Sequence, residues 1–518
     1  MLHRHLLQGF TDSLFKSFAG RNDRDFNMTE NGCHVVTAVT ADCDEDQRFT
    51  NSDTDDPISV ELKKLIGAKE SSYAATLLSE LVLMAGVPKG QVTIAQANGI
   101  VVILRTMREH SDHSLVQEQG CGVLRKLAFK EENRVRIAQA GGIDLILDAM
   151  RRHSDSFGVQ EQGCVALNNL AVNNKDNKLR IAEAGGIDVI LAAMQNHSNH
   201  SGIQLEGCWT ISNLAVNTSN QIKISEKGGI DMILTAMQHH STHAGIQEHG
   251  CAALFTLAAD TNTNKVKIAE ACGITVILNA IQQHSSCSGV IEYGCAALWN
   301  LAVNMDNHSK IALESDVIEV VIDAMRKHPN QTGVQERGCG ALMIFANRKE
   351  NQSRIAAAGG IAVVLDAMQK HPNHAGISTK GCGALLSLAI DKTNQQKIAD
   401  EGGIETILGA MRKHITDADV QEGGCGSLQN LANNENNQVR IDEAGGVEAI
   451  LNAMQEHFSN PDVQAQGCGS LWTLAHNVDI KATIVSAGGV ELIHDAMQKH
   501  HKHCGVNVLG GLALVALE

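Results

Sequence analysis

Nine cysteines in this 518-residue chain directly follow a glycine and recur every 43 or 44 residues. They are Cys121, Cys164, Cys208, Cys251, Cys295, Cys339, Cys382, Cys425 and Cys468. Thiolates at regular spacing could bind a metal or carry redox chemistry. However, each falls on the apolar face of a predicted helix, and stacked helices lie about 8–10 Å apart, too far for neighbouring thiolates to share one zinc ion. We therefore interpret these cysteines as small buried hydrophobic residues.

Histidines recur in pairs with the His-x-x-His spacing of some metal sites: His110/His113, His197/His200, His240/His243, His371/His374 and His500/His503. A zinc site needs three or four ligands, and neither cysteine nor acid stands near these pairs at ligand spacing. We interpret them as surface residues at helix ends, where an imidazole suits the helix dipole. The Gly-Gly dipeptides lack the Lys-Ser/Thr of a phosphate loop, and the sequence holds none of the common catalytic motifs. We therefore predict no enzymatic activity, no metal and no cofactor.

The elements that position these residues follow the same period. Gly-Gly-Ile or Gly-Gly-Val recurs seven times, and Met/Ile-x-x-His marks ten positions from Met107/His110 to Met497/His500. A fixed period in the forties is typical of two or three helices per unit stacked into a solenoid. We predict ten units over residues 91–518, preceded by a degenerate capping repeat at residues 57–90.

One unit illustrates the predicted helices. A short first helix opens at Asn177, which suits N-capping, and Gly185-Gly186 ends it. A second helix spans 187–197 and a third spans about 202–216. When the third helix is numbered from its cysteine as position 0, positions 0, +2, +3, +6 and +7 form one uniform apolar face. Positions +1, +4, +5 and +8 vary, so they predict an individual surface, and the glycine at −1 predicts close packing.

The third-helix stretch Gly207-Cys208-Trp209-Thr210-Ile211-Ser212-Asn213-Leu214-Ala215 is similar to the third-helix consensus of armadillo repeats. The fuller Gly-Cys-x-x-Leu-x-Asn-Leu-Ala pattern also resembles vacuolar protein 8-like scaffolds and the armadillo region of leucine-rich-repeat kinases. This resemblance covers residues 91–518. It implies an all-α, right-handed α-solenoid, an armadillo-type superhelix of about ten three-helix repeats.

In armadillo proteins the third helices line a concave groove, where Trp at +1 and Asn at +5 hold an extended peptide. Only one unit here has both, Trp209 and Asn213. Aromatic residues are enriched at binding hot spots. The predicted partner-binding residues are Trp209, Asn213, Asn169, Phe255, Trp299, Asn300, Asn430 and Trp472. The alternative is that the tryptophans merely pack against the next repeat and that neighbouring loops bond the asparagines.

The formal net charge of −16 argues against nucleic-acid binding, which needs a basic surface, and against docking on anionic membranes. Apolar runs fall short of the roughly 20 residues of a membrane span. We predict a non-catalytic protein–protein interaction scaffold that binds extended peptides or partner domains along the concave third-helix surface. The alternative is a nuclear transport adaptor binding basic localisation signals, which the incomplete Trp/Asn ladder disfavours.

The two ends of the chain depart from the repeat. Residues 1–56 contain the acidic runs 41–46 and 51–56, so we expect a disordered acidic tail, which could compete for the groove only if the groove is basic. Residues 1–20 lack the uninterrupted apolar run of a secretory signal, which favours a cytoplasmic location, with the nucleus as a second. The apolar residues 508–518 lack a polar capping face and predict self-association through the C-terminal repeat.

Overall fold

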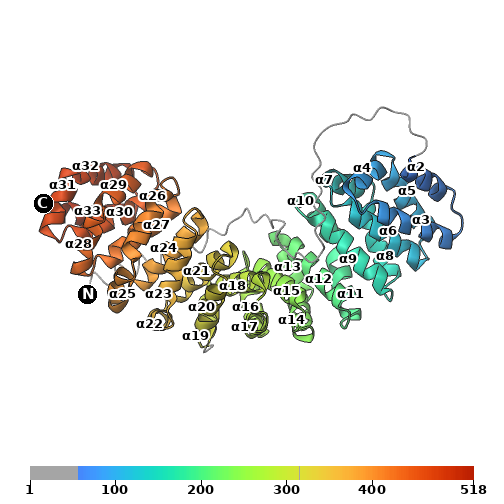
Figure 1. Cartoon of the computed structure of the whole chain (residues 1–518), viewed down its shortest axis with the longest axis horizontal. Helices are drawn as coiled ribbons and strands as arrows, with labels where there is room; N and C mark the ends of the chain where they lie inside the picture. Colours follow the sequence, from blue (N-terminus) through green and yellow to red (C-terminus); the bar gives the residue numbers. More distant parts are fainter. Residues whose placement is uncertain (1–55, 314–315) are drawn as a thin grey trace. The chain divides into compact units, whose positions relative to one another are not determined.

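The computed structural model describes residues 56–313 and 316–518, which contain 32 helices and no strand (Figure 1). The predicted all-α solenoid fold is confirmed. The described residues form two compact units, which we call the N-terminal unit (56–283) and the C-terminal unit (284–518). The predicted acidic tail lies outside the described residues apart from Asp56, whose carboxylate accepts a hydrogen bond from the Ser59 N–H at the start of α2 (Pro57–Ile66).

The N-terminal unit begins with a capping pair, α2 and α3 (Ser71–Met84), and continues as three-helix repeats. Its first helices are α4 (Pro88–Gln96), α7 (Glu131–Gln139), α10 (Lys175–Glu183), α13 (Thr218–Glu226) and α16 (Asn262–Glu270). Its second helices are α5 (Gly99–Glu109), α8 (Gly142–Arg152), α11 (Gly186–Asn196), α14 (Gly229–His239) and α17 (Gly273–Gln283). Its third helices are α6 (Ser114–Leu127), α9 (Phe157–Ala171), α12 (Ser201–Leu214) and α15 (Ala244–Leu257).

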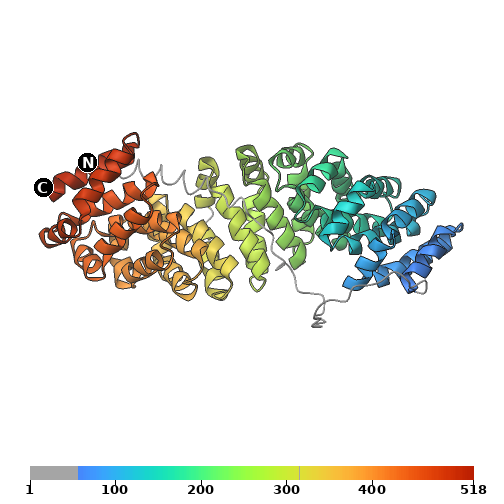
Figure 2. The ribbon, with the colours of Figure 1, turned by 90° about the horizontal axis from the view of Figure 1, so that it is seen from above.

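The C-terminal unit begins with a third helix and repeats the same order. Figure 2 shows the helices from above, coloured along the sequence. Its third helices are α18 (Ser288–Ala302), α21 (Thr332–Phe345), α24 (Ala375–Leu388), α27 (Ala418–Leu431), α30 (Pro461–Leu474) and α33 (Cys504–Leu517). Its first helices are α19 (Met305–Leu313), α22 (Lys349–Ala357), α25 (Lys392–Asp400), α28 (Glu435–Glu443) and α31 (Val478–Ser486). Its second helices are α20 (Val317–Lys327), α23 (Gly360–Lys370), α26 (Gly403–Lys413), α29 (Gly446–Glu456) and α32 (Gly489–Lys499).

Equivalent helices pack side by side within each unit. In the N-terminal unit the third helices α6, α9, α12 and α15 form one layer, and the second helices from α5 to α17 form another. In the C-terminal unit the third helices from α18 to α33 form the corresponding layer. The variable positions of the third helices therefore lie next to one another within each layer.

A close contact between a glycine of the third helix and a methionine of the second helix recurs in the repeats. A Cβ at Gly381 would lie 2.5 Å from Sδ of Met368 on the second helix. Real Cβ atoms essentially never lie within 3.0 Å of a non-bonded heavy atom. The same clash would arise at eight equivalent glycines: Gly120, Gly163, Gly207, Gly250, Gly338, Gly424, Gly467 and Gly510. The predicted packing role of this glycine is confirmed. This contact explains why glycine, which costs about 1 kcal/mol of helix propensity, recurs inside third helices.

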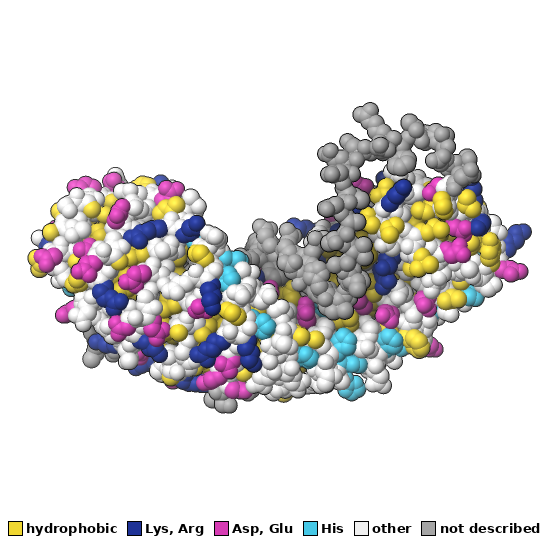
Figure 3. Space-filling model, viewed as in Figure 1, with side chains coloured by type: hydrophobic (Ala, Val, Ile, Leu, Met, Phe, Trp, Pro, Cys, Tyr) yellow, Lys and Arg dark blue, Asp and Glu magenta, His cyan; other side chains and the backbone are white. Residues whose placement is uncertain are grey.

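Histidine side chains join neighbouring repeats. The Nε2–H of His197 donates to the carbonyl of Ser154 at 2.7 Å, because a carbonyl can only accept. Equivalent bonds of 2.7–3.3 Å, each reaching 42 or 43 residues back, are made by His110, His153, His240, His328, His371, His414, His457 and His500. Histidine side chains gather near α11 and α14 in Figure 3. Gln204 Nε2 donates to the carbonyls of Met194 and His197, which joins the second and third helices of the same repeat.

The second histidine of four His-x-x-His pairs caps a third helix. Nδ1 of His200 accepts the backbone N–H of Ile203 at 3.4 Å, at the start of α12. The same cap occurs at His243, His374 and His503. Their placement at helix ends agrees with the sequence, and both members of these four pairs have structural hydrogen bonds. No group of three or more His, Cys, Asp or Glu that could hold a metal occurs among the described residues.

The prediction that Asn177 caps the first helix of its repeat is wrong. Helix α10 is capped by Asn174, whose Oδ1 accepts the Asn177 N–H at 2.9 Å. Asn177 is buried, and its Nδ2 donates to the carbonyls of Leu170 at 2.9 Å and Arg134 at 3.4 Å. Two asparagines stand three residues apart here, and the inner one joins its helix to the preceding third helix and to the preceding repeat.

We expect Gly381→Ala to destabilise the chain by about 1–3 kcal/mol, because the new methyl group overpacks the Met368 contact. Gly409→Ala is the matched control, since Gly409 is exposed inside α26 and a Cβ there meets nothing within 4 Å. That control should be neutral or stabilising by up to about 1 kcal/mol. Urea unfolding followed by circular dichroism compares them, and equal effects at both sites would contradict the role of the methionine contact.

Candidate peptide-binding surface

Third helices meet in a fixed register at their variable positions. A Cβ at Gly340, position +1 of α21, would lie 2.9 Å from the ring of Trp299, position +4 of α18. A Cβ at Gly383 of α24 would lie 2.5 Å from Sδ of Met343 on α21. The same close approach occurs between Gly426 and Leu386 and between Gly469 and Gln429. The side chain at +4 of one repeat therefore lies over position +1 of the next.

Trp299 is a packing residue in this register. It is 5% exposed, and Lys380 Nζ and Arg337 Cζ lie 4.8 and 5.8 Å from its ring centroids. Cations at these distances attract the face of an indole. This placement favours the packing alternative for Trp299 over a role as an exposed binding anchor.

Three of the predicted asparagines donate hydrogen bonds inside the third-helix layer. Asn169 Nδ2 donates to the carbonyl of Arg125 at 3.0 Å, and Asn430 Nδ2 donates to the carbonyl of Leu386 at 2.9 Å. In both cases the acceptor is position +4 of the preceding third helix. Asn213 Nδ2 donates to the side chain of the preceding third helix instead, as described below. Asn300 occupies the same position on α18 and is 3% exposed.

The eight predicted residues do not form one site within either unit. Asn169, Trp209, Asn213 and Phe255 belong to the N-terminal unit, and Trp299, Asn300, Asn430 and Trp472 belong to the C-terminal unit. Phe255 on α15 and Trp472 on α30 are half-buried at position +4. The ring of Trp472 lies near that of His476, with centroids 6.0 Å apart. Trp209 and Asn213 are the two that the structure places together in a wider cluster.

Trp209 lies where α9, α12 and α15 meet. Its half-buried indole stacks on the imidazole of His249 from α15, with ring centroids 4.6 Å apart and planes 5° apart. Burial lowers the pKa of His249 to about 4, so its imidazole is neutral at pH 7. One helical turn beyond Trp209, Asn213 Nδ2 donates to Oδ1 of Asn168 on α9 at 2.5 Å.

Four polar side chains on the same layer have a buried atom for which the described residues supply no hydrogen-bond partner. These atoms are Arg125 Nε, Asn168 Nδ2, Glu206 Oε2 and Ser212 Oγ. Asn168 and Ser212 are wholly buried. A buried polar atom without a partner costs about 1–3 kcal/mol, so these four atoms on three adjacent helices mark a part of the layer where polar groups are incompletely paired.

The sequence interpretation missed these four residues. Arg125, Asn168 and Ser212 occupy position +4, which it identified as variable, but it singled out only aromatic side chains there. Glu206 occupies position −2, which lies outside the predicted variable positions +1, +4, +5 and +8. The register explains its presence, because position −2 of each third helix also reaches position +1 of the preceding one, as Gln466 Oε1 does at Gly426.

The Glu206 carboxylate experiences opposing influences. Burial raises its pKa to about 7, the Arg125 guanidinium on α6 acts to lower it, and Glu161 on α9 raises it. Burial and Glu161 also raise the pKa of Glu118 on α6. The Glu161 carboxylate therefore acts on both Glu118 and Glu206, and Arg125 is the cation that offsets the charge of Glu206.

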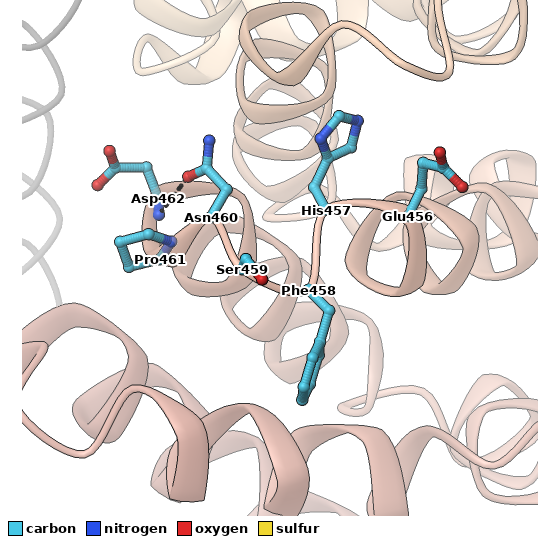
Figure 4. A pocket seen from close by; sticks show the side chains of 7 residues that line it. All are labelled: Glu456, His457, Phe458, Ser459, Asn460, Pro461 and Asp462. Atoms are coloured by element: carbon cyan, nitrogen blue, oxygen red, sulfur yellow. Dashed lines mark hydrogen bonds between the residues drawn. The ribbon is translucent and has the colours of Figure 1, made fainter.

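The recurring thiols and the described cavities offer no chemistry. The nine Gly-Cys thiols are buried, and burial raises the pKa of Cys121 to about 12, so this thiol is protonated at neutral pH. A hollow of about 520 Å³ is lined by residues 456–462 alone, the loop between α29 and α30 (Figure 4). In this loop Asn460 caps α30, and Phe458 points away from the other lining side chains (Figure 4). No described helix is both long and apolar enough to cross a membrane.

Comparison with known proteins now decides the family. Residues 148–408, just over half of the chain, match the family described as protein zer-1 homolog-like, C-terminal domain. The chain belongs to this family. The zer-1 homolog-like match, together with the solved structures below, confirms the prediction of an armadillo-type repeat. No curated protein matches the chain in sequence.

Two solved structures share the fold of this zer-1 homolog-like chain. An engineered protein superimposes with a TM-score of 0.68 at 23% identity, covering 80% of this chain and 98% of its own. A structure from work on a phosphorylation switch that controls the interaction between cadherin and β-catenin superimposes with a TM-score of 0.70 at 16% identity, covering 90% and 92%. At these identities the likeness concerns the fold alone.

Glu206→Gln should make the chain more stable than the wild type at pH 8 and leave it nearly unchanged at pH 4.5. A carboxyl whose folded-state pKa is raised binds its proton more tightly when folded, so its contribution is present at low pH and declines as the pH rises toward about 7. The expected difference at pH 8 is on the order of 1 kcal/mol. Urea unfolding at both pH values measures it, and a gap independent of pH would show that Glu206 ionises normally.

Proposed function

We propose that this chain is a non-catalytic protein-interaction scaffold that binds an extended segment of a partner protein on the third-helix layer of its N-terminal unit. The observation that carries the proposal is the set of buried polar atoms without partners on α6, α9 and α12, beside the half-buried Trp209. Polar atoms of this kind are completed by a ligand's own hydrogen-bonding groups. A large aromatic side chain among them is the residue type enriched at binding hot spots.

Catalysis is not part of the proposal. Armadillo-type repeats are typically non-enzymatic scaffolds. The imidazole of His249, which stacks on the Trp209 indole, is neutral at pH 7. The likeness to a β-catenin structure, which comes from work on cadherin binding, supports a protein as the partner.

The alternative of a nuclear transport adaptor receives less support. The Trp/Asn combination occurs once, at Trp209 and Asn213, and the amide of Asn213 already donates to Asn168. Two further +5 asparagines, Asn169 and Asn430, donate to backbone carbonyls of the preceding helix. These amides are thus hydrogen-bonded within the fold, whereas a Trp/Asn ladder would need them free to bond a long peptide. We also propose a cytoplasmic location for this scaffold, which imaging of the tagged chain in cells would test.

Self-association through the C-terminal repeat is a further proposal. Val515 on α33 and Val478 on α31 are 72% and 79% exposed, so this repeat carries apolar surface that another copy could bury. We expect the mass of the full chain in multi-angle light scattering to rise with concentration, and Val515→Lys to suppress the rise. A monomer at every concentration would rule this out.

Trp209→Ala combined with Ser212→Ala should reduce partner recovery at least about tenfold, because loss of a hot-spot aromatic costs about 2 kcal/mol or more of binding free energy. The control is Trp472→Ala, which removes the other half-buried tryptophan from a third helix of the C-terminal unit. Quantitative affinity purification from cell extract compares the variants after circular dichroism confirms helical content. Undiminished recovery with a folded double variant would contradict the proposed surface. Trp299 is unsuitable as a probe because it is buried.

A further inference from the structure

Each first helix buries one residue and exposes another on its opposite side. The seventh residue is an isoleucine in all ten first helices of the described chain, and each of these side chains is at most 1% exposed. The fifth residue lies about 200° away around the helix. Its side chain therefore contributes little to the core, and its type is free to serve the surface.

The fifth residue of every first helix in the N-terminal unit is aliphatic. We call these five residues the first-helix stripe: Val92, Val135, Leu179, Ile222 and Val266. The first four are 37–46% exposed, and the last is half-buried. In three consecutive first helices of the C-terminal unit the same position holds Ser309, Ser353 and Gln396. The fold therefore accepts polar residues here, so five aliphatic side chains in succession indicate a role at the surface.

Hydrogen bonds between first helices hold the stripe in register. Asn177 Nδ2 on α10 donates at 3.4 Å to the carbonyl of Arg134 on α7, the residue directly before Val135. Equivalent bonds of 3.4 and 3.5 Å join Asn264 to Gln221 and Asn133 to Gln91. Figure 1 shows α4, α7 and α10 following one another along one side of the N-terminal unit. The stripe therefore presents one aliphatic side chain per repeat along a line.

A row of carboxylates runs beside the stripe. The ninth residue of α10, α13 and α16 is an exposed glutamate: Glu183, Glu226 and Glu270. Residues four apart share a helix face, so each carboxylate lies one turn beyond the aliphatic side chain of its helix. Two cations at the sixth position bond to the preceding first helix instead, Arg180 to the Ala138 carbonyl and Lys267 to Ser225 Oγ. The first turns, on the other side of the stripe, carry charges of both signs.

The spacing of the stripe distinguishes the kinds of segment that could cover it. Stacked helices lie about 8–10 Å apart, and an α-helix rises about 10.5 Å over seven residues. A helix laid across the first helices thus brings a residue to each repeat every seven positions, all near one face. An extended segment advances about 10 Å in three residues, but side chains three apart point to opposite faces. The stripe therefore matches a helix.

We propose that the first-helix stripe binds an amphipathic helix of a partner protein. Leucine, isoleucine or valine recurs every seven residues on this helix and packs on Val135, Leu179 and Ile222. Lysine or arginine on one flank faces Glu183 and Glu226, because cations complement the carboxylate row. The stripe belongs to the first helices and the proposed peptide surface to the third helices, so this proposal goes beyond the proposed function and does not depend on it.

Fluorescence anisotropy with the full chain and three labelled peptides of about 24 residues tests the proposal. All have an Ala/Gln background that favours a helix. The first carries leucine every seven residues and lysines along one flank. The second has the same composition but leucine every five residues, which spreads the leucines around the helix. The third carries glutamate in place of lysine. The first should bind at least about tenfold more tightly than either of the others.

Paired substitutions locate the binding helix. Leu179→Ser combined with Ile222→Ser should weaken binding of the first peptide at least about tenfold, because two apolar contacts are lost. Serine fills the same position in α22, so the variant should keep its helical content, which circular dichroism checks. Val439→Ser is the matched control, since Val439 is 44% exposed at the fifth position of α28 but has Gln396 and Ala482 as its counterparts on either side. It should leave the affinity unchanged.

Charge removal tests the carboxylate row. Glu183→Gln combined with Glu226→Gln should weaken binding of the lysine peptide about five- to tenfold and strengthen binding of the glutamate peptide. Glu443→Gln is the control, because Glu443 is the exposed ninth residue of α28 in the C-terminal unit. This control should change neither affinity.

Three results would overturn the proposal. They are equal binding of the seven-residue and five-residue leucine peptides, binding that survives the Leu179/Ile222 double substitution, and equal losses in that variant and in Val439→Ser. The Trp209/Ser212 double variant should bind the first peptide like the wild type. Because that variant judges the third-helix surface by affinity purification, the two proposals stand or fall separately.

Discussion

The close approach of a second-helix methionine to a third-helix glycine is the contact on which the rest of this fold depends. A Cβ at these glycines would lie within about 2.7 Å of the Met Cγ or Sδ in nine repeats, so the distance between the two helices is set to the same value each time. Identical helix spacing makes consecutive repeats geometrically equivalent. Any bond that one repeat makes to its neighbour can then recur along the chain, as in other repeat proteins.

The recurring polar bonds follow from that equivalence. A histidine at the end of a second helix finds a carbonyl 42 or 43 residues back, and a buried asparagine such as Asn177 reaches both a third helix and the preceding repeat. These side chains have a fixed role, so they leave few positions free to differ between repeats. On the third helices those positions are −2, +1, +4 and +5, and the register brings +4 of one repeat and −2 of another to the same +1 residue.

The period predicted a helical solenoid from sequence, because glycine, cysteine, methionine and histidine each recur on it, and the resemblance of the third helix added the armadillo type. The site was harder to predict, since the environment of a side chain at +4 depends on a residue about 41 positions later. Trp299 looks like an exposed anchor until Gly340 is placed beneath its ring. The asparagines at +5 were selected by resemblance, yet the acceptors of Asn169 and Asn430 are backbone carbonyls that a sequence does not display.

The junction around α12 in the N-terminal unit is filled differently from the junctions between α18 and α30 in the C-terminal unit. From α18 to α30 the large side chain stands at +4 and the next +1 is glycine, so Trp299 or Met343 covers the junction from within. Around α12 the large side chain is Trp209 at +1, and its neighbours at +4 are the small polar Asn168 and Ser212. Asparagine and serine cannot cover a junction with apolar surface, and they add hydrogen-bonding groups that the neighbouring helices leave unpaired.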